Sequence, residues 1–351
     1  MGDHPTEEDE IDIRGLNGCV LQAENLSIGY RQSKGKRLVV AEGLELQLNK
    51  GELVCLVGPN GVGKSTLLRS LAGLQPVLSG EVNLLGRSIK KVPPRELAQA
   101  ISVVLTEQVN VGAMRAFDVV GLGRYPYTNW LGSLSQQDIQ AICDALKAVN
   151  AEDLTNRFYN ELSDGERQKI LIARALAQEP LILLLDEPTA FLDLPRRVGL
   201  MQMLRDLAHE LGKTILVSTH DLDLALHSAD MIWLMSKNGQ IKDGAPEDLV
   251  LSGQFEHAFA AQGVQFDTRT GNFVFSSQSG RKINVSGVGL AKIWTDRALS
   301  RAGFEVVPAF EAQECQVEVQ QLGNEVVWRL YRQGLVVEHT SIYALLVSLN
   351  E

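Results

Sequence analysis

The sequence predicts an α/β fold: a mostly parallel sheet with a helical insertion beside it, followed by a small C-terminal α+β domain. Short apolar runs suited to buried strands recur along the chain, at residues 52–57, 181–185, 214–218 and 231–235. Helical segments separate these runs, and strands that alternate with helices favour parallel strands joined by crossovers. After residue 253 the pattern changes to short strands, hairpin signals and isolated helices. The length of 351 residues is consistent with about two domains.

Composition and charge narrow the class of protein. The net charge is −10, from 33 basic and 43 acidic residues, which argues against a nucleic-acid coat and predicts no nucleic-acid partner. No apolar run approaches the roughly 18 residues that span a bilayer, so we expect any membrane role to come through a partner. The cysteines lie without metal-ligand spacing, which favours a reducing compartment: Cys19, Cys55, Cys143 and Cys315.

The composition also predicts the division of the chain. Residues 1–12 contain six acids and no Lys or Arg, unlike the basic start of a signal peptide. We therefore expect an acidic flexible leader over 1–17. A first domain is predicted over 18–253 and an accessory domain over 254–351.

The elements of the first domain follow from periodicity and punctuation. Strands are predicted near 21–26 and 38–48, and the run 52–57 leads through a glycine-rich loop into a helix over 64–73. Residues 88–180 are predicted to be mainly helical. Two helices stand out there, one opening at Pro93-Pro94 and one over 136–149. A further helix is predicted over 196–211.

The C-terminal region shows hairpin and helix signals in turn. A hairpin is predicted over 263–275 with Thr270-Gly271 near its turn, and a second at Gly323-Asn324 between strands 316–319 and 325–330. The remaining predicted elements are strands at 282–285 and 304–307 and helices at 290–302 and 341–349.

The glycine-rich loop has the chemistry of a phosphate cradle. Small residues let backbone N–H groups approach phosphates, and the helix N-terminus adds partial positive charge. Lys64 suits the β- and γ-phosphates, the Ser65 hydroxyl suits Mg²⁺, and Thr66 adds an α-phosphate contact. The alternative is a glycine-rich turn that binds nothing, which the flanking strand and helix disfavour. The loop comprises Gly58, Pro59, Asn60, Gly61, Val62, Gly63, Lys64 and Ser65.

Three polar residues follow buried strands and extend this interpretation. Asp186 ends an apolar strand, where a lone carboxylate is costly unless it holds a cation or hydrogen-bond donors, so we expect it to hold Mg²⁺. Glu187 is then placed to polarise a water for attack on the γ-phosphate. His220, at the end of a neighbouring strand, would orient that water. Alone, each could be a solvated or structural side chain.

The segment Leu162-Ser163-Asp164-Gly165-Glu166 opens a helix. Ser163 and Glu166 form the S-x-x-E pattern of a capping box, which is a sufficient structural explanation. A capped helix start with Gly165 allowing close approach is also an anion site. Lys64 is already expected to bind the phosphates of the nucleotide in its own subunit. The second anion site could therefore contact a phosphate bound by another subunit.

Taken in order, these motifs resemble the ATP-binding subunit of ABC transporters over roughly residues 20–250. The resemblance implies an ABC ATPase (P-loop NTPase) core with a helical subdomain, using ATP and Mg²⁺. It implies that Tyr30 stacks on adenine and that Ser163 and Gly165 belong to the signature motif. Asp193 would lie in the D-loop. In this family two cassettes close head-to-tail, so the resemblance also implies an ATP-dependent homodimer that shares its sites.

The chain departs from the family pattern at one catalytic position. Members place a Gln after a strand near 103–105, whereas this chain reads Leu105-Thr106-Glu107-Gln108. We assign Gln108 to that role, contacting Mg²⁺ and water, with Glu107 as its rival. A Glu there would add negative charge beside Mg²⁺ and retune hydrolysis.

Residues 119–127 resemble the corresponding segment of importers of iron-siderophore, haem and vitamin B12, although an ordinary helix-to-loop structure with Pro126 as breaker also explains them. The resemblance implies transmembrane permease subunits as partners, an indirect link to a periplasmic or surface substrate-binding protein, and a peripheral place on the cytoplasmic face of the cell membrane. The alternatives are an importer of another substrate class and a soluble ABC-type ATPase not coupled to transport. The C-terminal domain is expected to be accessory, either regulatory or for dimerisation.

Overall fold

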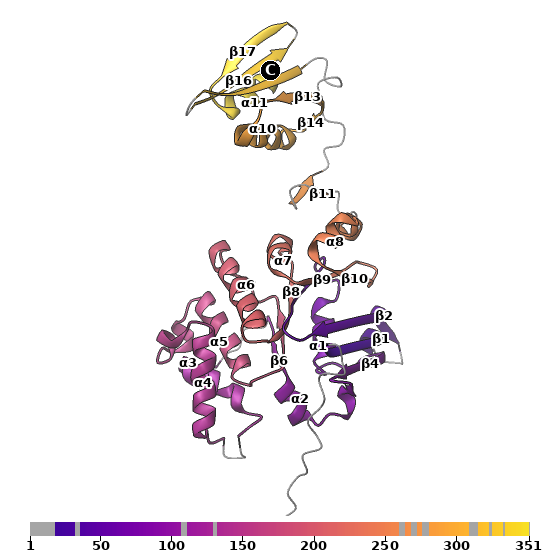
Figure 1. Ribbon diagram of the computed structural model, residues 1–351, viewed down its shortest axis with the longest axis vertical. Helices are drawn as coiled ribbons and strands as arrows, with labels where there is room; N and C mark the ends of the chain where they lie inside the picture. Colours follow the sequence, from indigo (N-terminus) through magenta and orange to yellow (C-terminus); the bar gives the residue numbers. More distant parts are fainter. Residues whose placement is uncertain are drawn as a thin grey trace, which may run out of the picture. The chain divides into compact units, whose positions relative to one another are not determined.

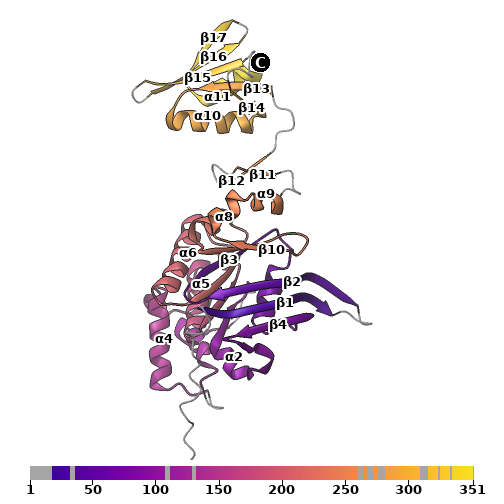
Figure 2. The same ribbon diagram turned by 45° about the vertical axis from the view of Figure 1, so that its right-hand side comes forward.

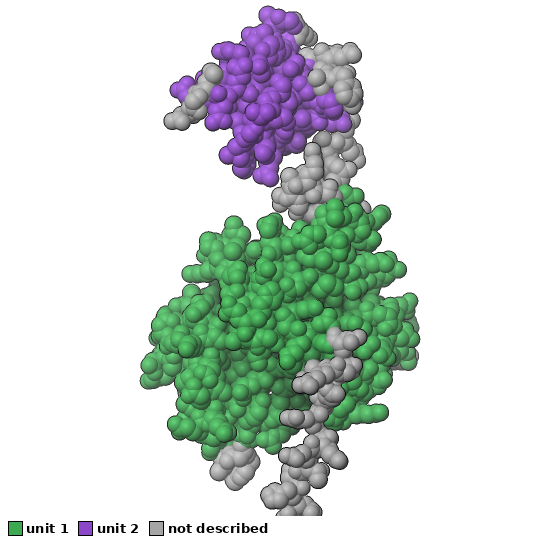
Figure 3. All heavy atoms as spheres, viewed as in Figure 1, with its two compact units in different colours: residues 1–261, 266–272 green, residues 262–265, 273–351 purple. Residues whose placement is uncertain are grey.

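In the computed structural model, the chain forms two compact units (Figure 3). One comprises residues 1–261 and 266–272, and the other comprises residues 262–265 and 273–351. The structure describes residues 18–31, 36–106, 111–128, 132–259, 264–267, 272–275, 281–308, 315–322, 325–332 and 334–350. The predicted leader and the two predicted turns, Thr270-Gly271 and Gly323-Asn324, lie outside these residues. None of the described helices is long and apolar enough to cross a bilayer.

A six-stranded sheet forms the centre of the first unit, in the order β10-β9-β3-β8-β7-β6. All neighbours pair in parallel except β10 with β9, which confirms the predicted parallel sheet. Every residue of β3 and β7 is buried because helices or a second sheet cover both faces. The strands are β3 (Leu53–Val57), β6 (Ile101–Val104), β7 (Ile182–Asp186), β8 (Thr214–Thr219), β9 (Met231–Met235) and β10 (Ile241–Gly244).

An antiparallel sheet packs beside the first, in the order β2-β1-β4-β5 (Figure 2). Its apolar residues join those of β3, β7 and helix α1 in a single core, which fixes the start of α1 against both sheets. Its strands are β1 (Cys19–Arg31), β2 (Arg37–Asn49), β4 (Ser79–Leu84) and β5 (Arg87–Ser88), and α1 spans Lys64–Leu71.

The region 88–180 is less helical than predicted. Its helices are α2 (Pro94–Ala100), α3 (Ala116–Gly121), α4 (Gln136–Ala148) and α5 (Asp164–Leu176). Between α2 and α3, however, β6 pairs with β7 at the sheet edge. The periodicity did not predict this strand because four residues are too few for a clear period, although the family resemblance implied a strand near 103–105. Helices α3, α4 and α5 contact one another and form the predicted helical block (Figure 1).

One buried cation holds this block together. Arg124 lies 2.8 Å from Asp138 at the start of α4 and 2.6 Å from Glu179, and it donates to the carbonyl of Ala177 at 2.7 Å. Its guanidinium also lies over the ring of Tyr127, 3.9 Å from the centroid. These contacts give residues 119–127 a structural role in joining the block to the end of α5.

The first unit continues with α6 (Leu194–His209), α7 (Leu222–Ser228), α8 (Pro246–Leu251) and α9 (Gln254–Phe259). Phe255 of α9 is fully buried, and α9 contacts β9. The predicted hairpin after α9 is present as two paired strands, β11 (Val264–Asp267) and β12 (Asn272–Phe275).

The second unit is the predicted small α+β domain. Its sheet has the order β14-β13-β15-β16-β17, and α10 and α11 pack on one face around a core that includes Leu299, Trp328 and Leu345. Strand β17 was not predicted. The elements are β13 (Arg281–Ser286), α10 (Gly289–Arg301), β14 (Phe304–Val306), β15 (Cys315–Leu322), β16 (Glu325–Arg332), β17 (Leu335–His339) and α11 (Ile342–Asn350).

Candidate active site

The phosphate loop joins the end of β3 to the start of α1, and two of its glycines have no room for a side chain. An added Cβ at Gly58 would lie 2.3 Å from the carbonyl oxygen of Met235, and one at Gly63 would lie 2.1 Å from Cγ1 of Val40. Gly63 also has φ of 115°, which L side chains rarely adopt. Met235 and Val40 therefore pack closely against the loop backbone. The loop leads into the N-terminus of α1, where backbone N–H groups can bind a phosphate.

Lys64 lies within this loop and is almost completely buried. Its Nζ donates to the carbonyls of Gly58 at 2.9 Å and Pro59 at 3.2 Å, and it lies 3.8 Å from Oε1 of Glu187. Burial lowers the pKa of Lys64, while the carboxylates of Glu187 and Asp186 act in the opposite direction. The ammonium group is thus largely removed from water, and the nearby carboxylates stabilise its positive charge. A buried positive charge of this kind is suited to pairing with phosphate.

Asp186 is the centre of a buried group of oxygen atoms. Its Oδ1 accepts hydrogen bonds from the hydroxyls of Ser65 at 3.0 Å and Ser218 at 2.7 Å, and its carbonyl accepts one from Thr106 at 2.8 Å. Hydroxyl and carboxylate oxygens are the ligands that Mg²⁺ prefers, so the donor set fits this ion. Neither Ser218 nor Thr106 was assigned a role from the sequence. Ser218 carried a signal, since it is polar within a buried strand.

Glu187 and His220 meet directly beyond this group. Oε2 of Glu187 lies 3.4 Å from Nδ1 of His220, while its backbone N–H donates to the hydroxyl of Ser218 at 2.9 Å and to its carbonyl at 3.1 Å. The φ of Glu187 is 48°, a strained value for a residue other than glycine that costs on the order of 1–3 kcal/mol. The surrounding contacts hold it there, so its carboxylate is fixed between Lys64 and His220.

Tyr30 lies near the end of β1, beside the first turn of α1. Its hydroxyl is 2.9 Å from Oγ1 of Thr66, and the side chain is half exposed. An exposed ring at this position can be reached by a flat ligand next to the phosphate loop. The predicted stacking on adenine remains a prediction.

Ser163, Gly165 and Asp193 belong to a second cluster. Ser163 caps α5 in the predicted capping box: its hydroxyl accepts from the N–H of Glu166 at 3.4 Å, and its own N–H donates to the Glu166 carboxylate at 2.8 Å. Asp193 caps α6, accepting from the N–H of Arg196 at 3.0 Å. Within the described residues, no hydrogen bond or ion pair joins this cluster to the phosphate loop.

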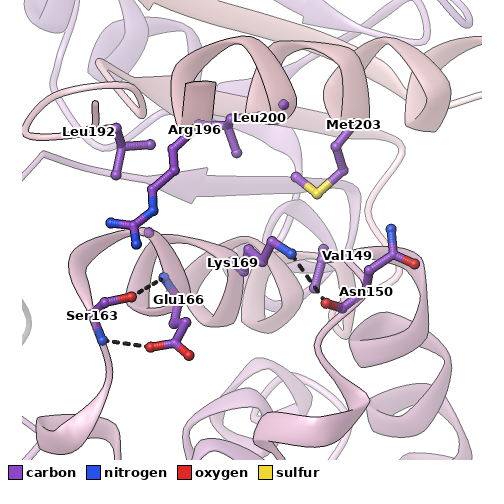
Figure 4. Close-up of a pocket in the computed structure, with 11 residues that line it drawn as sticks. Val149, Asn150, Ser163, Glu166, Lys169, Leu192, Arg196, Leu200 and Met203 are labelled. Carbon is purple, nitrogen blue, oxygen red and sulfur yellow. Dashed lines mark hydrogen bonds between the residues drawn. The ribbon is translucent and has the colours of Figure 1, made fainter. Parts of the chain in front are cut away.

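A hollow of about 390 Å³ lies between these two helix starts (Figure 4). In Figure 4 the side chain of Arg196 points from α6 toward the start of α5, where Ser163 lies. An added Cβ at Gly165 would lie 3.0 Å from Cδ of Arg196, so the two helix starts approach closely at this glycine. The helix start and the guanidinium together give the hollow the character of an anion site.

Glu107 and Gln108 lie outside the described residues. Their assignment therefore remains a prediction, with both alternatives open.

The packing behind Gly63 leads to a stability prediction. We expect Gly63→Ala to destabilise the chain more than Gly61→Ala, because the added methyl at 63 collides with Val40 while the space at 61 is open. Both positions have positive φ, 115° and 75°, which strains an L residue, and only Gly63→Ala adds the collision. Thermal unfolding without nucleotide measures the difference; equal melting temperatures for the two variants would contradict it.

Comparison with known proteins agrees with this geometry. Residues 41–190 match the ABC transporter family, and residues 280–350 match the iron ABC transporter C-terminal domain. An uncharacterised ABC transporter ATP-binding protein of Methanocaldococcus jannaschii, MJ0873, is 48% identical over 231 residues, 66% of this chain and 78% of its own length. The ferric enterobactin transport ATP-binding protein FepC of Escherichia coli is 33% identical over 247 residues, 70% of this chain and 89% of its own.

A solved structure of another protein has a similar fold. The dimeric structure of MJ0796, a bacterial ABC transporter cassette, matches with a TM-score of 0.56 and 28% identity, covering 64% of this chain and 98% of that one. The first unit contains every described site residue. The chain thus belongs to the ABC transporter family, as one of its ATP-hydrolysing, ATP-binding subunits.

Proposed function

We propose that this ATPase energises the import of an iron–siderophore complex. The proposal rests on the observation that both parts of the chain are similar to proteins or domains named for iron transport. The cassette resembles a ferric enterobactin transport protein, and the C-terminal unit matches a domain of iron ABC transporters. These likenesses favour iron–siderophore over the haem and cobalamin that residues 119–127 equally allowed.

The oxygen atoms around Asp186 are the proposed Mg²⁺ site. Ser65 and Asp186 would hold the ion, with Ser218 fixing the carboxylate through its 2.7 Å hydrogen bond. The ion supplies charge neutralisation for the phosphate oxygens of ATP. Lys64 complements it from the loop, and the backbone N–H groups between Gly61 and Ser65 orient the phosphates.

Glu187 is proposed as the general base. Its carboxylate would accept the proton of the attacking water, while His220, 3.4 Å away, would hold the water in line with the γ-phosphate. Its backbone is fixed to Ser218 by two hydrogen bonds. The strained φ of Glu187 supports this role, because strain of this kind collects at positions where function fixes a side chain.

The second cluster is proposed to act on a different copy of the chain. Ser163 and Gly165 present a helix start but make no bond to their own phosphate loop among the described residues. The solved relative is dimeric. Two copies arranged head-to-tail would place this helix start on the γ-phosphate bound by the other copy, with Asp193 at the contact.

A groove of about 500 Å³ between α2, β6 and α5 is the proposed docking place for the permease. Its lining is largely apolar, with Arg174 and Gln178 at one side, which suits an amphipathic helix. The apolar residues include Leu74, Leu97, Ile101, Val103 and Leu171. Docking there would hold the ATPase at the cytoplasmic face of the membrane and connect it, through the permease, to a substrate-binding protein.

Stimulated hydrolysis tests this function. With the co-purified permease in vesicles, we expect a binding protein loaded with ferric siderophore to raise ATP hydrolysis several-fold, because substrate arrival favours the conformation in which the cassettes close. The same binding protein without iron is the control. Equal stimulation by both forms, or stimulation by loaded haem- or cobalamin-binding proteins alone, would contradict the iron–siderophore proposal.

A further inference from the structure

The last strand of the C-terminal sheet has an exposed apolar edge. Strand β17 reads Leu-Val-Val-Glu-His, and its first three side chains are 71%, 55% and 45% exposed at Leu335, Val336 and Val337. In antiparallel register, Val337 lies opposite the buried Leu330, so it belongs to the face that α10 and α11 cover. The helical layer covers this face of the strand at His339 but leaves Leu335 and Val337 exposed.

The backbone of β17 also has a free side. The strand pairs only with β16, and no residue of 335–339 makes another backbone hydrogen bond within the described part of the chain. An apolar strand with unpaired N–H and C=O groups is a template for a further strand. Its one charged side chain, Glu338, is already bound to Arg329 of its own sheet at 2.7 Å.

Two other edge strands, β10 and β14, are protected in ways that β17 is not. Strand β10 carries Lys242 and Asp243, and β14, at the opposite edge of the same C-terminal sheet, is only three residues long and carries Glu305. Charges and short length are the usual means by which proteins prevent edge pairing. Strand β17 contains no Lys, Arg or Pro. Its exposure is therefore typical of an interface.

We propose that β17 is a dimerisation strand that pairs antiparallel with β17 of a second copy of this chain. The inference rests on the proposed shared-site dimer, because that dimer keeps two copies of the domain tethered to one assembly at high effective concentration. A single strand edge is self-complementary under a two-fold axis, as an isologous contact requires.

The pairing has a defined register. A five-residue strand pairs over its whole length when the two-fold axis passes through its middle residue, Val337. Each Val337 then lies opposite the other, with the two Cβ atoms about 4.5–5.5 Å apart. Leu335 and Val337 from both copies would extend the apolar face of each sheet. The contact would hold two cassettes together after hydrolysis separates them and so favour their next closure.

Charge reversal at the axis tests the register. In a Glu187→Gln background, which traps the ATP dimer, we expect Val337→Lys and Val337→Glu each to raise the dimer dissociation constant at least about tenfold, because each places like charges opposite one another. Mixing the two variants should restore wild-type affinity, since Lys then faces Glu. This recovery excludes misfolding as the cause. Val288→Lys, at an 87% exposed valine in the same domain, should have no effect.

Crosslinking provides a second measurement. With the exposed Cys143 replaced by Ser, a Val337→Cys variant in the ATP-trapped dimer should be joined to its partner by a short bis-maleimide, whereas Val288→Cys should not. An ATP dimer that forms normally but shows no crosslink and no charge effect at 337 overturns the β17 contact and leaves the proposed function intact. Absence of any ATP dimer in Glu187→Gln overturns both.

Discussion

Replacing Glu187 with Gln will leave ATP binding near its wild-type affinity and lower turnover by about 10²–10⁴-fold. The amide has the same shape, and the two backbone hydrogen bonds from residue 187 to Ser218 do not involve the side chain. The amide cannot, however, accept the proton of the attacking water. ATP should therefore persist between two closed copies, and steady-state hydrolysis with equilibrium nucleotide binding measures both effects.

A matched control separates this effect from a general loss of negative charge. Glu210→Gln makes the same substitution at an exposed position that ends α6, and it should hydrolyse ATP at the wild-type rate. If Glu187→Gln also turned over normally, the base would have to be another group, and the strained backbone at Glu187 would need a different explanation.

The catalytic residues could be predicted because their signals are local. The phosphate loop has fixed spacing between a buried strand and a helix, and Asp186-Glu187 follows the next buried strand of the same kind. The parallel sheet was predictable for the same reason: each of its central strands is a short, mainly apolar run. Ligands of an open α/β sheet bind at the carboxyl ends of its strands. The residues that bind a phosphate there therefore follow buried strands directly in the sequence.

What could not be predicted depends on contacts between distant residues. The parallel register of β7 and β8 places Ser218 beside Asp186, and no local pattern contains that register. Arg124 was considered only as part of a loop, because its partner Glu179 lies far along the chain. Strand β17 was missed since it is short and follows a hairpin directly. Its first three residues are all apolar, so the strand lacks the alternation that predicts a half-buried strand.

The second large effect is expected at the signature helix. Ser163→Arg should leave binding of ATP to a single copy unchanged and lower turnover on the order of 10²-fold, because the helix start that would contact the γ-phosphate of the other copy is blocked. The substitution also removes a helix cap, at a cost of about 1 kcal/mol. Ser135→Arg removes an equivalent capping box from α4, away from the proposed contact, and should hydrolyse ATP normally.

Mixing two inactive variants tests whether the site is shared. In a mixed dimer of Glu187→Gln and Ser163→Arg, one site carries both changes, whereas the other combines an intact Glu187 with an intact Ser163. An equal mixture should therefore regain roughly a quarter of wild-type activity, since about half of the dimers are mixed and each has one intact site. If each copy instead hydrolysed ATP alone, the mixture would show no more activity than the average of the two variants, and a site completed by Ser163 of the other copy would be excluded.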